Sequence, residues 1–263
     1  MHIVVTIKQV PDPDIPPGHF RVDESAGKVV PPSGVAPIMN GYDANALEEA
    51  LQLRDKHGGS VTAISLGPSE ARDTLKRAIA MGANAAVLIT DSAFDGADAM
   101  VIAHALAAGI RKLDPADLVL CGRQASDTDA GQVALGRGEL LGMPAISPVQ
   151  AISIDGGSAR VERMVEDGHQ VLEVRLPAML AVSSEMNEPR YPPLKGIMAA
   201  GRAQIPVWSS ADLGLSSDAL QPVSTLRRLY RESRESHAEM IQADSPAAAG
   251  EALALKLREA KLI

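Results

Sequence analysis

The chain has 263 residues, a formal net charge of −8 at pH 7 and a pI near 5.3. This acidic balance argues against nonspecific binding to nucleic acid or to an anionic lipid surface, and leaves small molecules and protein partners as ligands. With 46% hydrophobic but 2% aromatic residues the core must be aliphatic, and the single cysteine, Cys121, excludes an intrachain disulfide and indicates a small buried side chain rather than a reactive thiol.

The first half of the chain alternates between short apolar runs and amphipathic segments. Residues 11–37 are rich in Pro and Gly, and residues 21–23 and 28–30 within them favour a hairpin. Strands are expected at 3–7, 61–66, 85–89 and 118–121, and helices from Asp43, as a side-chain cap, to Gly58 and at 69–81, 97–113 and 130–141. This alternation predicts a mainly parallel sheet covered by helices on both faces.

The second half has a different texture. Residues 150–154 and 159–165 alternate around an Asp-Gly-Gly turn, which predicts an antiparallel hairpin at one edge of the sheet, and further strands are expected at 171–176 and 178–182. From residue 187 onward the chain no longer reads as part of a compact sheet. A Pro-rich loop, a short helical stretch at 197–202, a long polar stretch and an amphipathic helix at 247–262 follow. This extended C-terminal arm is either disordered or packed on a partner, and we favour a partner because apolar residues such as Trp208 and Leu226 would otherwise face solvent.

Residues 118–133 are the stretch around which the chain is organised. The apolar run ends at Gly122, a polar loop follows, and a helix comes next. In open α/β sheets ligands bind where such strands end, because the helix N-terminus offers free N–H groups. Asp127 or Asp129 would suit the N-cap of that helix, and Gly131 would let a ligand approach the backbone. The stretch therefore reads as an anion or nucleotide cradle, with an ordinary βα loop as the alternative.

Catalytic motifs are missing from the sequence. It has no GxxxxGK[ST], HExxH or GxSxG pattern, and the six histidines show no metal-ligand spacing. Residues 136–142 loosely resemble a dinucleotide fingerprint but fall inside a helix, so we interpret their glycines as helix packing. We expect no metal site and no catalytic side chain on this chain, so that any redox chemistry must come from a bound cofactor.

A series of short motifs follows in order along residues 3–202. They are Val5-Thr-Ile-Lys-Gln-Val-Pro-Asp12, Met39-Asn-Gly-Tyr-Asp43, Ala46-Leu-Glu-Glu-Ala50, Ser65-Leu-Gly-Pro68, Ala80-Met-Gly-Ala83, Gly122-Arg-Gln-Ala125 and Asn187-Glu-Pro-Arg-Tyr191. In sequence and spacing they resemble the small (beta) subunit of electron transfer flavoproteins. The last motif is the most specific of them.

The resemblance implies an adenine-nucleotide-binding, Rossmann-like α/β fold with a mostly parallel, doubly wound sheet. It also implies a heterodimer with a larger alpha subunit that holds most of the FAD, while this chain keeps AMP or a second FAD in its own cradle. The residues that it places around this nucleotide are Thr6, Asn40, Gly41, Tyr42, Asp43, Leu66, Gly122, Arg123, Gln124, Ala125, Ser126, Asp127, Thr128, Asp129, Ala130, Gly131, Gln132 and Val133. The backbone N–H groups at 132–134 would meet the phosphates.

The resemblance also implies protein partners. Loop residues would dock on acyl-CoA-type dehydrogenases, with Leu194 as the inserted anchor, and electrons would pass on to a membrane quinone oxidoreductase. The residues assigned to docking are Asn187, Glu188, Pro189, Arg190, Tyr191, Leu194, Ile197 and Met198. The expected domains are 1–186 for the nucleotide, 187–202 for partner recognition and 203–263 as an arm on the alpha subunit. We expect a cytoplasmic protein whose arm is not fully ordered without that subunit.

Alternatives to this reading stay open. The chain departs from the family pattern at residues such as Gly131 and Val133. The sequence therefore does not decide whether the cradle holds AMP, as in a simple carrier, or a second FAD, as in an electron-bifurcating, NADH-linked flavoprotein. A stress-type ATP/AMP-binding module or another ATP-using enzyme is a different class. An ATP pyrophosphatase should carry a glycine-rich loop after the first strand, where residues 8–11 have no glycine. A structural subunit with an empty cradle is the last alternative.

Overall fold

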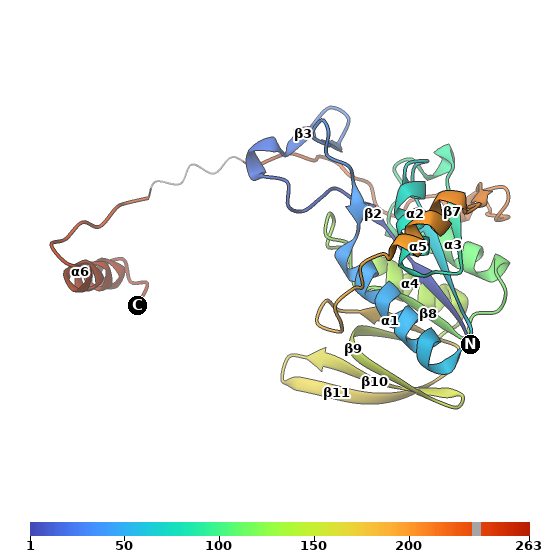
Figure 1. Cartoon of the computed structure of the whole chain (residues 1–263). Helices are drawn as coiled ribbons and strands as arrows, with labels where there is room; N and C mark the ends of the chain where they lie inside the picture. Colours follow the sequence, from blue (N-terminus) through green and yellow to red (C-terminus); the bar gives the residue numbers. More distant parts are fainter. Residues whose placement is uncertain (233–237) are drawn as a thin grey trace. The chain divides into compact units, whose positions relative to one another are not determined.

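The computed structural model describes residues 1–232 and 238–263, which form two compact units, 1–229 and 230–263 (Figure 1). Residues 233–237 of the expected arm lie outside the described residues. The second unit carries α6 (Pro246–Glu259), which begins with Ser245 as N-cap, its hydroxyl accepting from the backbone N–H of Ala248 at 3.2 Å. This is the amphipathic helix that the sequence predicts near the end of the chain.

The first unit is built on one large sheet. From edge to edge its described strands are β11 (Gly168–Arg175), β10 (Ser158–Val165), β9 (Ala145–Asp155), β12 (Ala178–Val182), β8 (Leu118–Gly122), β1 (His2–Thr6), β6 (Ser60–Leu66), β7 (Ala85–Ile89) and β13 (Val207–Trp208). All neighbouring pairs from β9 to β13 are parallel, and β10 pairs antiparallel with both β9 and β11. The predicted α/β class and the antiparallel addition to a mostly parallel sheet are confirmed.

Helices cover both faces of this sheet, because successive side chains of a strand point to opposite sides. α1 (Gly41–His57) and α2 (Ala71–Met81) lie on one face, and α3 (Ala99–Lys112) and α4 (Gln132–Leu141) lie on the other. In the central strand β1, Ile3 and Val5 pack in one cluster with Leu47 of α1, whereas Val4 packs in the other with Val101 of α3. A short helix, α5 (Leu194–Arg202), packs on α2.

The first unit also contains short strands and 3-10 turns outside the large sheet. Two short two-stranded sheets form, one from β2 (Gln9–Val10) and β5 (Ile38–Met39), the other from β3 (Arg21–Asp23) and β4 (Lys28–Val30). The second is the hairpin that the sequence predicts. Short 3-10 turns are η1 (Pro17–His19), η2 (Ser92–Phe94) and η3 (Asp218–Leu220). Among the described residues, no helix combines the length and the apolar character needed to cross a bilayer.

The expectation that the chain leaves the sheet after residue 187 is wrong in one place. β13 adds to the edge of the sheet, with Val207 opposite Leu88 and Trp208 opposite Ile89. The Trp208 ring packs with the core on the α3 face, and Lys112 Nζ lies 4.9 Å from its centroid. A strand of two residues is too short to show the alternating pattern by which strands are recognised in sequence.

Candidate functional site

A cavity of about 550 Å³ opens at the carboxyl ends of the central parallel strands. Thr6 at the end of β1, Leu66 at the end of β6 and Gly122 at the end of β8 all line it. Along the chain, β6 and β7 are added in turn on one side of β1, and β8 is then added on the other side of β1. The cavity thus lies at the point where strand order reverses, which is the usual ligand site of open α/β sheets.

Asn40 fixes the loop that follows β8. Its side chain is 1% exposed, its Nδ2 donates to the carbonyl of Gln124 at 2.9 Å, and its Oδ1 accepts from the N–H of Ser126 at 3.1 Å. One amide group therefore satisfies an acceptor and a donor on the loop backbone and ties the loop to the residue that precedes α1.

Asp43 links three elements below the cavity. The residue preceding α1 is Asn40, so the expectation that Asp43 caps this helix is wrong; position 43 falls inside the first turn. Its carboxylate instead accepts from the N–H of Lys8 after β1 and from the N–H of Gly122 at the end of β8, both at 2.8 Å. Burial raises the pKa of Asp43 to about 6, although these two hydrogen bonds, Asn40 and the charge of Arg137 act in the opposite direction.

The N-terminus of α4 faces the cavity without a side-chain cap. The residue preceding α4 is Gly131, with φ +62°, and the first turn contains no acidic residue. The proposed caps Asp127 and Asp129 are therefore wrong, because both lie upstream of the residue that immediately precedes the helix. Asp127 binds Lys8 Nζ at 2.7 Å, and Asp129 accepts from Gln124 Nε2 at 2.7 Å. The first N–H groups of α4 thus remain available to an anion.

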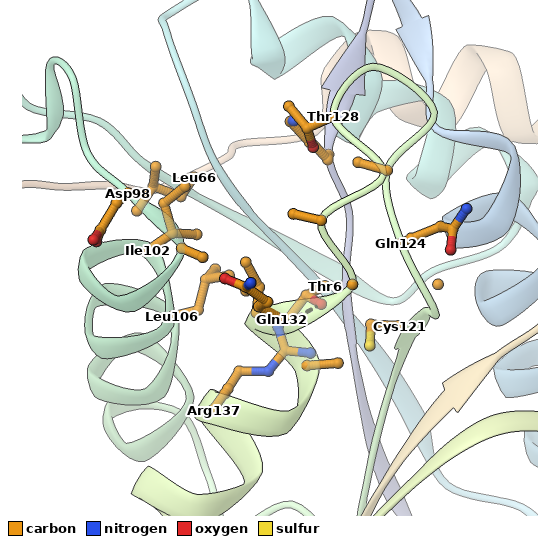
Figure 2. A pocket seen from close by; sticks show the side chains of 18 of the residues that line it. Thr6, Leu66, Asp98, Ile102, Leu106, Cys121, Gln124, Thr128, Gln132 and Arg137 are labelled. Carbon is orange, nitrogen blue, oxygen red and sulfur yellow. Dashed lines mark hydrogen bonds between the residues drawn. The ribbon is translucent and has the colours of Figure 1, made fainter. Parts of the chain in front are cut away.

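Arg137 lies one turn further along α4 and was not predicted as a site residue. It is 1% exposed and lines the cavity, and its Nη1 donates to Thr6 Oγ1 at 2.6 Å. Figure 2 shows its guanidinium next to Thr6, with which it forms this hydrogen bond. Among the described residues, neither Nε nor Nη2 of Arg137 has a hydrogen-bond partner. The available sequence signal was a single cation in a helical segment whose one other charged residue is Glu139.

The glycines on either side of Arg137 let α4 pack closely on its neighbours: Gly136 meets a helix, as the sequence suggests, and Gly138 meets a strand. A Cβ at Gly136 would lie 3.3 Å from Met100 Sδ of α3, and one at Gly138 would lie 2.6 Å from the Cβ of Ala145 of β9. α4 therefore sits close to its neighbours, and Arg137 is enclosed. Cys121 nearby is also buried, as the sequence predicts, and this burial raises the pKa of its thiol to about 11.

The far wall of the cavity comes from the start of α3 and from residues 224–226. Asp98 joins the two: its Oδ1 accepts from the N–H of Met100 and Val101 as the N-cap of α3, and its Oδ2 accepts from the N–H of Val223 and Ser224 at 2.8 and 2.9 Å. Sequence reasoning missed these residues because the contact joins segments that lie far apart in the chain.

Most residues that the sequence assigns to the nucleotide line this cavity. They are Thr6, Asn40, Asp43, Leu66, Gly122, Arg123, Gln124, Ala125, Thr128, Ala130, Gly131, Gln132 and Val133. The remaining five are not among the lining residues: Gly41, Tyr42, Ser126, Asp127 and Asp129. Of these, Tyr42 has its ring centroid 5.4 Å from the guanidinium carbon of Arg123.

The expected docking loop is anchored at one end and exposed at the other. Arg190 binds Glu48 of α1 through Nε at 2.8 Å and Asp55 through Nη1 at 3.1 Å, and Asn45 donates to the carbonyl of Asn187 at 2.6 Å. Glu188 is exposed and Pro189 is half-buried. The large exposed side chains that follow are Tyr191, Leu194, Ile197 and Met198, at 88%, 75%, 54% and 57%. The exposed residues form an apolar surface on a firmly held loop and α5.

The chemistry of the cavity suits a nucleotide. Apolar side chains of Leu66, Ile102 and Leu106 offer contact for a flat ring, and the uncapped start of α4 offers N–H donors for a phosphate. The two unpartnered nitrogens of Arg137 add hydrogen-bond capacity for an anion. Among the described residues, no group of three or more His, Cys, Asp or Glu side chains is arranged to hold a metal ion.

Comparison with known proteins points in one direction. The family model described as "Electron transfer flavoprotein domain" matches residues 29–213. The chain is 43% identical over 213 residues to "Electron transfer flavoprotein subunit beta" of Clostridium acetobutylicum, covering 81% of this chain and 80% of that protein. It is 38% identical over 267 aligned positions, covering 100% of both chains, to "Caffeyl-CoA reductase-Etf complex subunit CarD" of Acetobacterium woodii. It is also 40% identical to "Protein FixA" of Azorhizobium caulinodans, over 82% of this chain and 77% of that protein.

Proposed function

The chain belongs to the electron transfer flavoprotein family as a beta-type subunit that takes part in electron transfer, and from this premise we propose that its cavity holds an adenine nucleotide, either AMP or a second FAD. The observation that carries the proposal is the uncapped N-terminus of α4 at a cavity of about 550 Å³ on the strand-order switch point. Family membership removes the grounds for the ATP-using alternative.

The residues of this chain bind and orient the nucleotide. The N–H groups of Gln132 and Val133 hold the phosphate, and Leu66 contacts the adenosine. Asn40 and Asp43 keep the cradle in shape through the contacts described above. The FAD of the complex, held mainly by the alpha subunit, supplies reversible electron storage when bound. No side chain here transfers a proton or forms a covalent bond in the process.

The exposed surface formed by Tyr191, Leu194, Ile197 and Met198 docks acyl-CoA-type dehydrogenases, and a membrane quinone oxidoreductase takes the electrons onward. An apolar anchor of this kind, on a loop held by Arg190, suits a partner that binds transiently. The arm at 203–263 contributes to the contact with the alpha subunit, chiefly through residues 230–263, which form a compact unit of their own.

A second candidate is a subunit of an electron-bifurcating flavoprotein complex. It is favoured by the relative from Acetobacterium woodii, which is named as part of a caffeyl-CoA reductase–Etf complex and aligns over the full length of both chains. In that case the cavity holds a working FAD, and the dehydrogenase partner is NADH-linked.

The test measures the nucleotides of the complex directly. The chain is co-expressed with its alpha subunit, the purified complex is denatured, and released FAD and AMP are quantified by chromatography and mass. One FAD and one AMP per heterodimer support the simple carrier, whereas two FAD and no AMP support the second candidate. One FAD without any adenine nucleotide on this chain would overturn the proposal.

A matched pair of variants assigns the nucleotide to this cavity. Gly131→Trp introduces a large side chain at the start of α4, at a φ of +62° that favours glycine. It should lower the nucleotide content of this chain and the thermal stability of the heterodimer, while Gly157→Trp, at a turn with open space around it, should change neither. Unchanged stability in Gly131→Trp would instead support a structural subunit with an empty cradle.

A further inference from the structure

Arg137 presents a permanent positive charge inside the cavity with most of its donors unused. Arg137 is 1% exposed, and its Nη1 donates to the hydroxyl of Thr6 at 2.6 Å. Within the described residues, Nε and Nη2 make no hydrogen bond. A buried guanidinium normally has its donors paired, because leaving them unpaired costs the desolvation free energy of the group.

The neighbouring groups do not supply the missing acceptors. Asp43 is the carboxylate that acts on Arg137 through its charge, but its two oxygens already accept the backbone N–H groups of Lys8 and Gly122. The Cys121 thiol also interacts with Arg137, but burial raises its pKa to about 11, so it stays neutral and offers the guanidinium only a weak sulfur acceptor. Asp43 thus lowers the free-energy cost of burying the charge of Arg137, but the guanidinium still has N–H groups without acceptors among the described residues.

The geometry of α4 directs the free N–H groups of Arg137 toward the N-terminus of the helix, where the phosphate is proposed to bind. Position 137 follows Val133 by four residues and Ala134 by three, so that all three lie on the same face of α4, and all three line the cavity. Side chains of a helix lean toward its N-terminus, so the long side chain of Arg137 extends back toward the first turn. Gln132, the first residue of that turn, lines the same cavity.

We infer that Arg137 binds an anionic phosphate oxygen of the adenine nucleotide, together with the N-terminus of α4, and thereby makes the cavity select phosphorylated adenosine over adenosine itself. The inference rests on the proposed function, because it concerns the same cavity. The shared chemistry is a phosphate attached to adenosine, which both AMP and FAD provide. Arg137 is thus a ligand-contacting residue for which the sequence motifs of the cradle gave no indication.

The experiment compares ligands that differ only in the phosphate. The heterodimer is stripped of nucleotide, and the dissociation constants of adenosine and AMP are measured by calorimetry for the wild type and for Arg137→Met. The variant should weaken AMP about 10- to 100-fold, as expected for lost charge-assisted hydrogen bonds, and adenosine less than about 3-fold. Arg137→Lys, which keeps the charge but not the planar fork, should fall between the two.

Control variants separate the alternatives. Arg77→Met removes one positive charge from the exposed side of α2, outside the cavity lining, and should change neither constant. If Arg137→Met fails to assemble, Arg137→Gln serves in its place, since it removes the charge and keeps a polar side chain. If the wild type binds AMP and Arg137→Met binds it equally well, the inference is overturned and the proposed function is not. The same holds if Arg137→Met loses AMP and adenosine equally. A wild type that binds neither ligand would overturn the proposed function.

Discussion

Gly122 shows how closely two segments approach each other below the cavity. A Cβ at this position would collide with the Cβ of Tyr42 and lie 2.8 Å from Asp43 Oδ1 and from the carbonyl carbon of Tyr42. Only a residue without a side chain lets the end of β8 donate its N–H to Asp43. The sequence identifies this glycine as the end of a strand, but the contact that requires it comes from a helix start far earlier in the chain.

We predict that Gly122→Ala destabilises the folded chain by about 1–3 kcal/mol, because a well-packed backbone contact must open to admit the methyl group. The free energy of unfolding, measured by chemical denaturation of the full-length chain, checks this. Gly157→Ala is the control, since a Cβ there meets nothing within 4 Å. Equal stabilities of the two variants would contradict the prediction.

Asp43 should make stability depend on pH in an unusual direction. Its pKa is raised from 3.8 to about 6 in the folded protein, so the folded state binds the proton more tightly than the unfolded state does. The contribution to stability is therefore full below about pH 3.8 and is lost as the pH rises through about 6. The difference in unfolding free energy between wild type and Asp43→Asn should fall by roughly 2–3 kcal/mol between pH 4 and pH 7.

The control for Asp43→Asn is Asp114→Asn, which removes one negative charge from an exposed loop position. It should leave the pH dependence of the wild type nearly unchanged. If the difference between wild type and Asp43→Asn is flat over this range, or grows with pH, burial does not dominate the titration of Asp43.

At the scale of residues, the sequence predicts which residues line the cavity better than it predicts the hydrogen bonds among them. The loop at 122–133 and the residues at 40 and 43 could be chosen because strand ends and glycines mark them. The wrong assignments concern which side chain meets which backbone group: Asp43, Asp127 and Asp129 were expected as helix caps. Such pairings depend on distances between segments, which periodicity and spacing do not contain.

The loop at 187–193 owes its position to α1. Arg190 binds the Glu48 carboxylate through both Nε and Nη2, at 2.8 and 3.0 Å, and the Glu48 side chain is 5% exposed. Burial would raise the pKa of Glu48, but the hydrogen bonds from Arg190 and Gln52 outweigh it and hold this pKa below the ordinary value. The ion pair between Arg190 and Glu48 thus fixes one end of a loop whose other end is apolar and exposed.

We predict that Arg190→Met frees this loop, because the buried Glu48 carboxylate loses its cation. The loss should be about 1–3 kcal/mol, less than for a fully buried pair, since a third of the Arg190 side chain is exposed. Hydrogen exchange at residues 187–193 should become faster while β1 and β8 stay protected. Arg160→Met, which breaks the exposed pair of Arg160 with Glu162, is the control and should leave exchange in the loop unchanged.

At the scale of elements, the sequence predicts long, periodic segments and misses short ones. The helices α1 to α4 and the strands from β1 to β12 of the large sheet were expected close to their observed bounds, except that β9 begins at residue 145 and not at 150. β13 was missed because its two residues are fixed by a tertiary contact, the hydrogen bonds from the N–H groups of Leu88 and Thr90 to Pro206 and Trp208. Local propensity alone does not create such a strand.

At the scale of the whole molecule, the chain divides after Leu229 into a large unit and a small one. The large unit contains the sheet, both clusters of the core and every residue that lines the cavity. The small unit has no buried residue in α6, and its exposed apolar side chains include Leu253, Leu255 and Leu262. A helix of this kind needs a surface to cover its apolar residues.

We predict that a chain shortened to residues 1–229 stays folded but loses affinity for the alpha subunit. Its thermal midpoint should lie within a few degrees of that of the full chain, because the core is complete. Co-purification with the alpha subunit and calorimetry of the two purified chains measure the association. Unfolding of the shortened chain would contradict the division into units, and undiminished binding would contradict the role of the C-terminal unit.

The position of β1 at the middle of the sheet has a consequence for synthesis. β1 pairs with β6 on one side and with β8 on the other. On the ribosome, which adds about 5–20 residues per second, β8 follows β1 by an interval on the order of ten seconds. During that time one edge of the apolar strand His2–Thr6 lacks its neighbour. We therefore expect this open strand edge to need protection from other chains until residues 118–122 have been made and have paired with it.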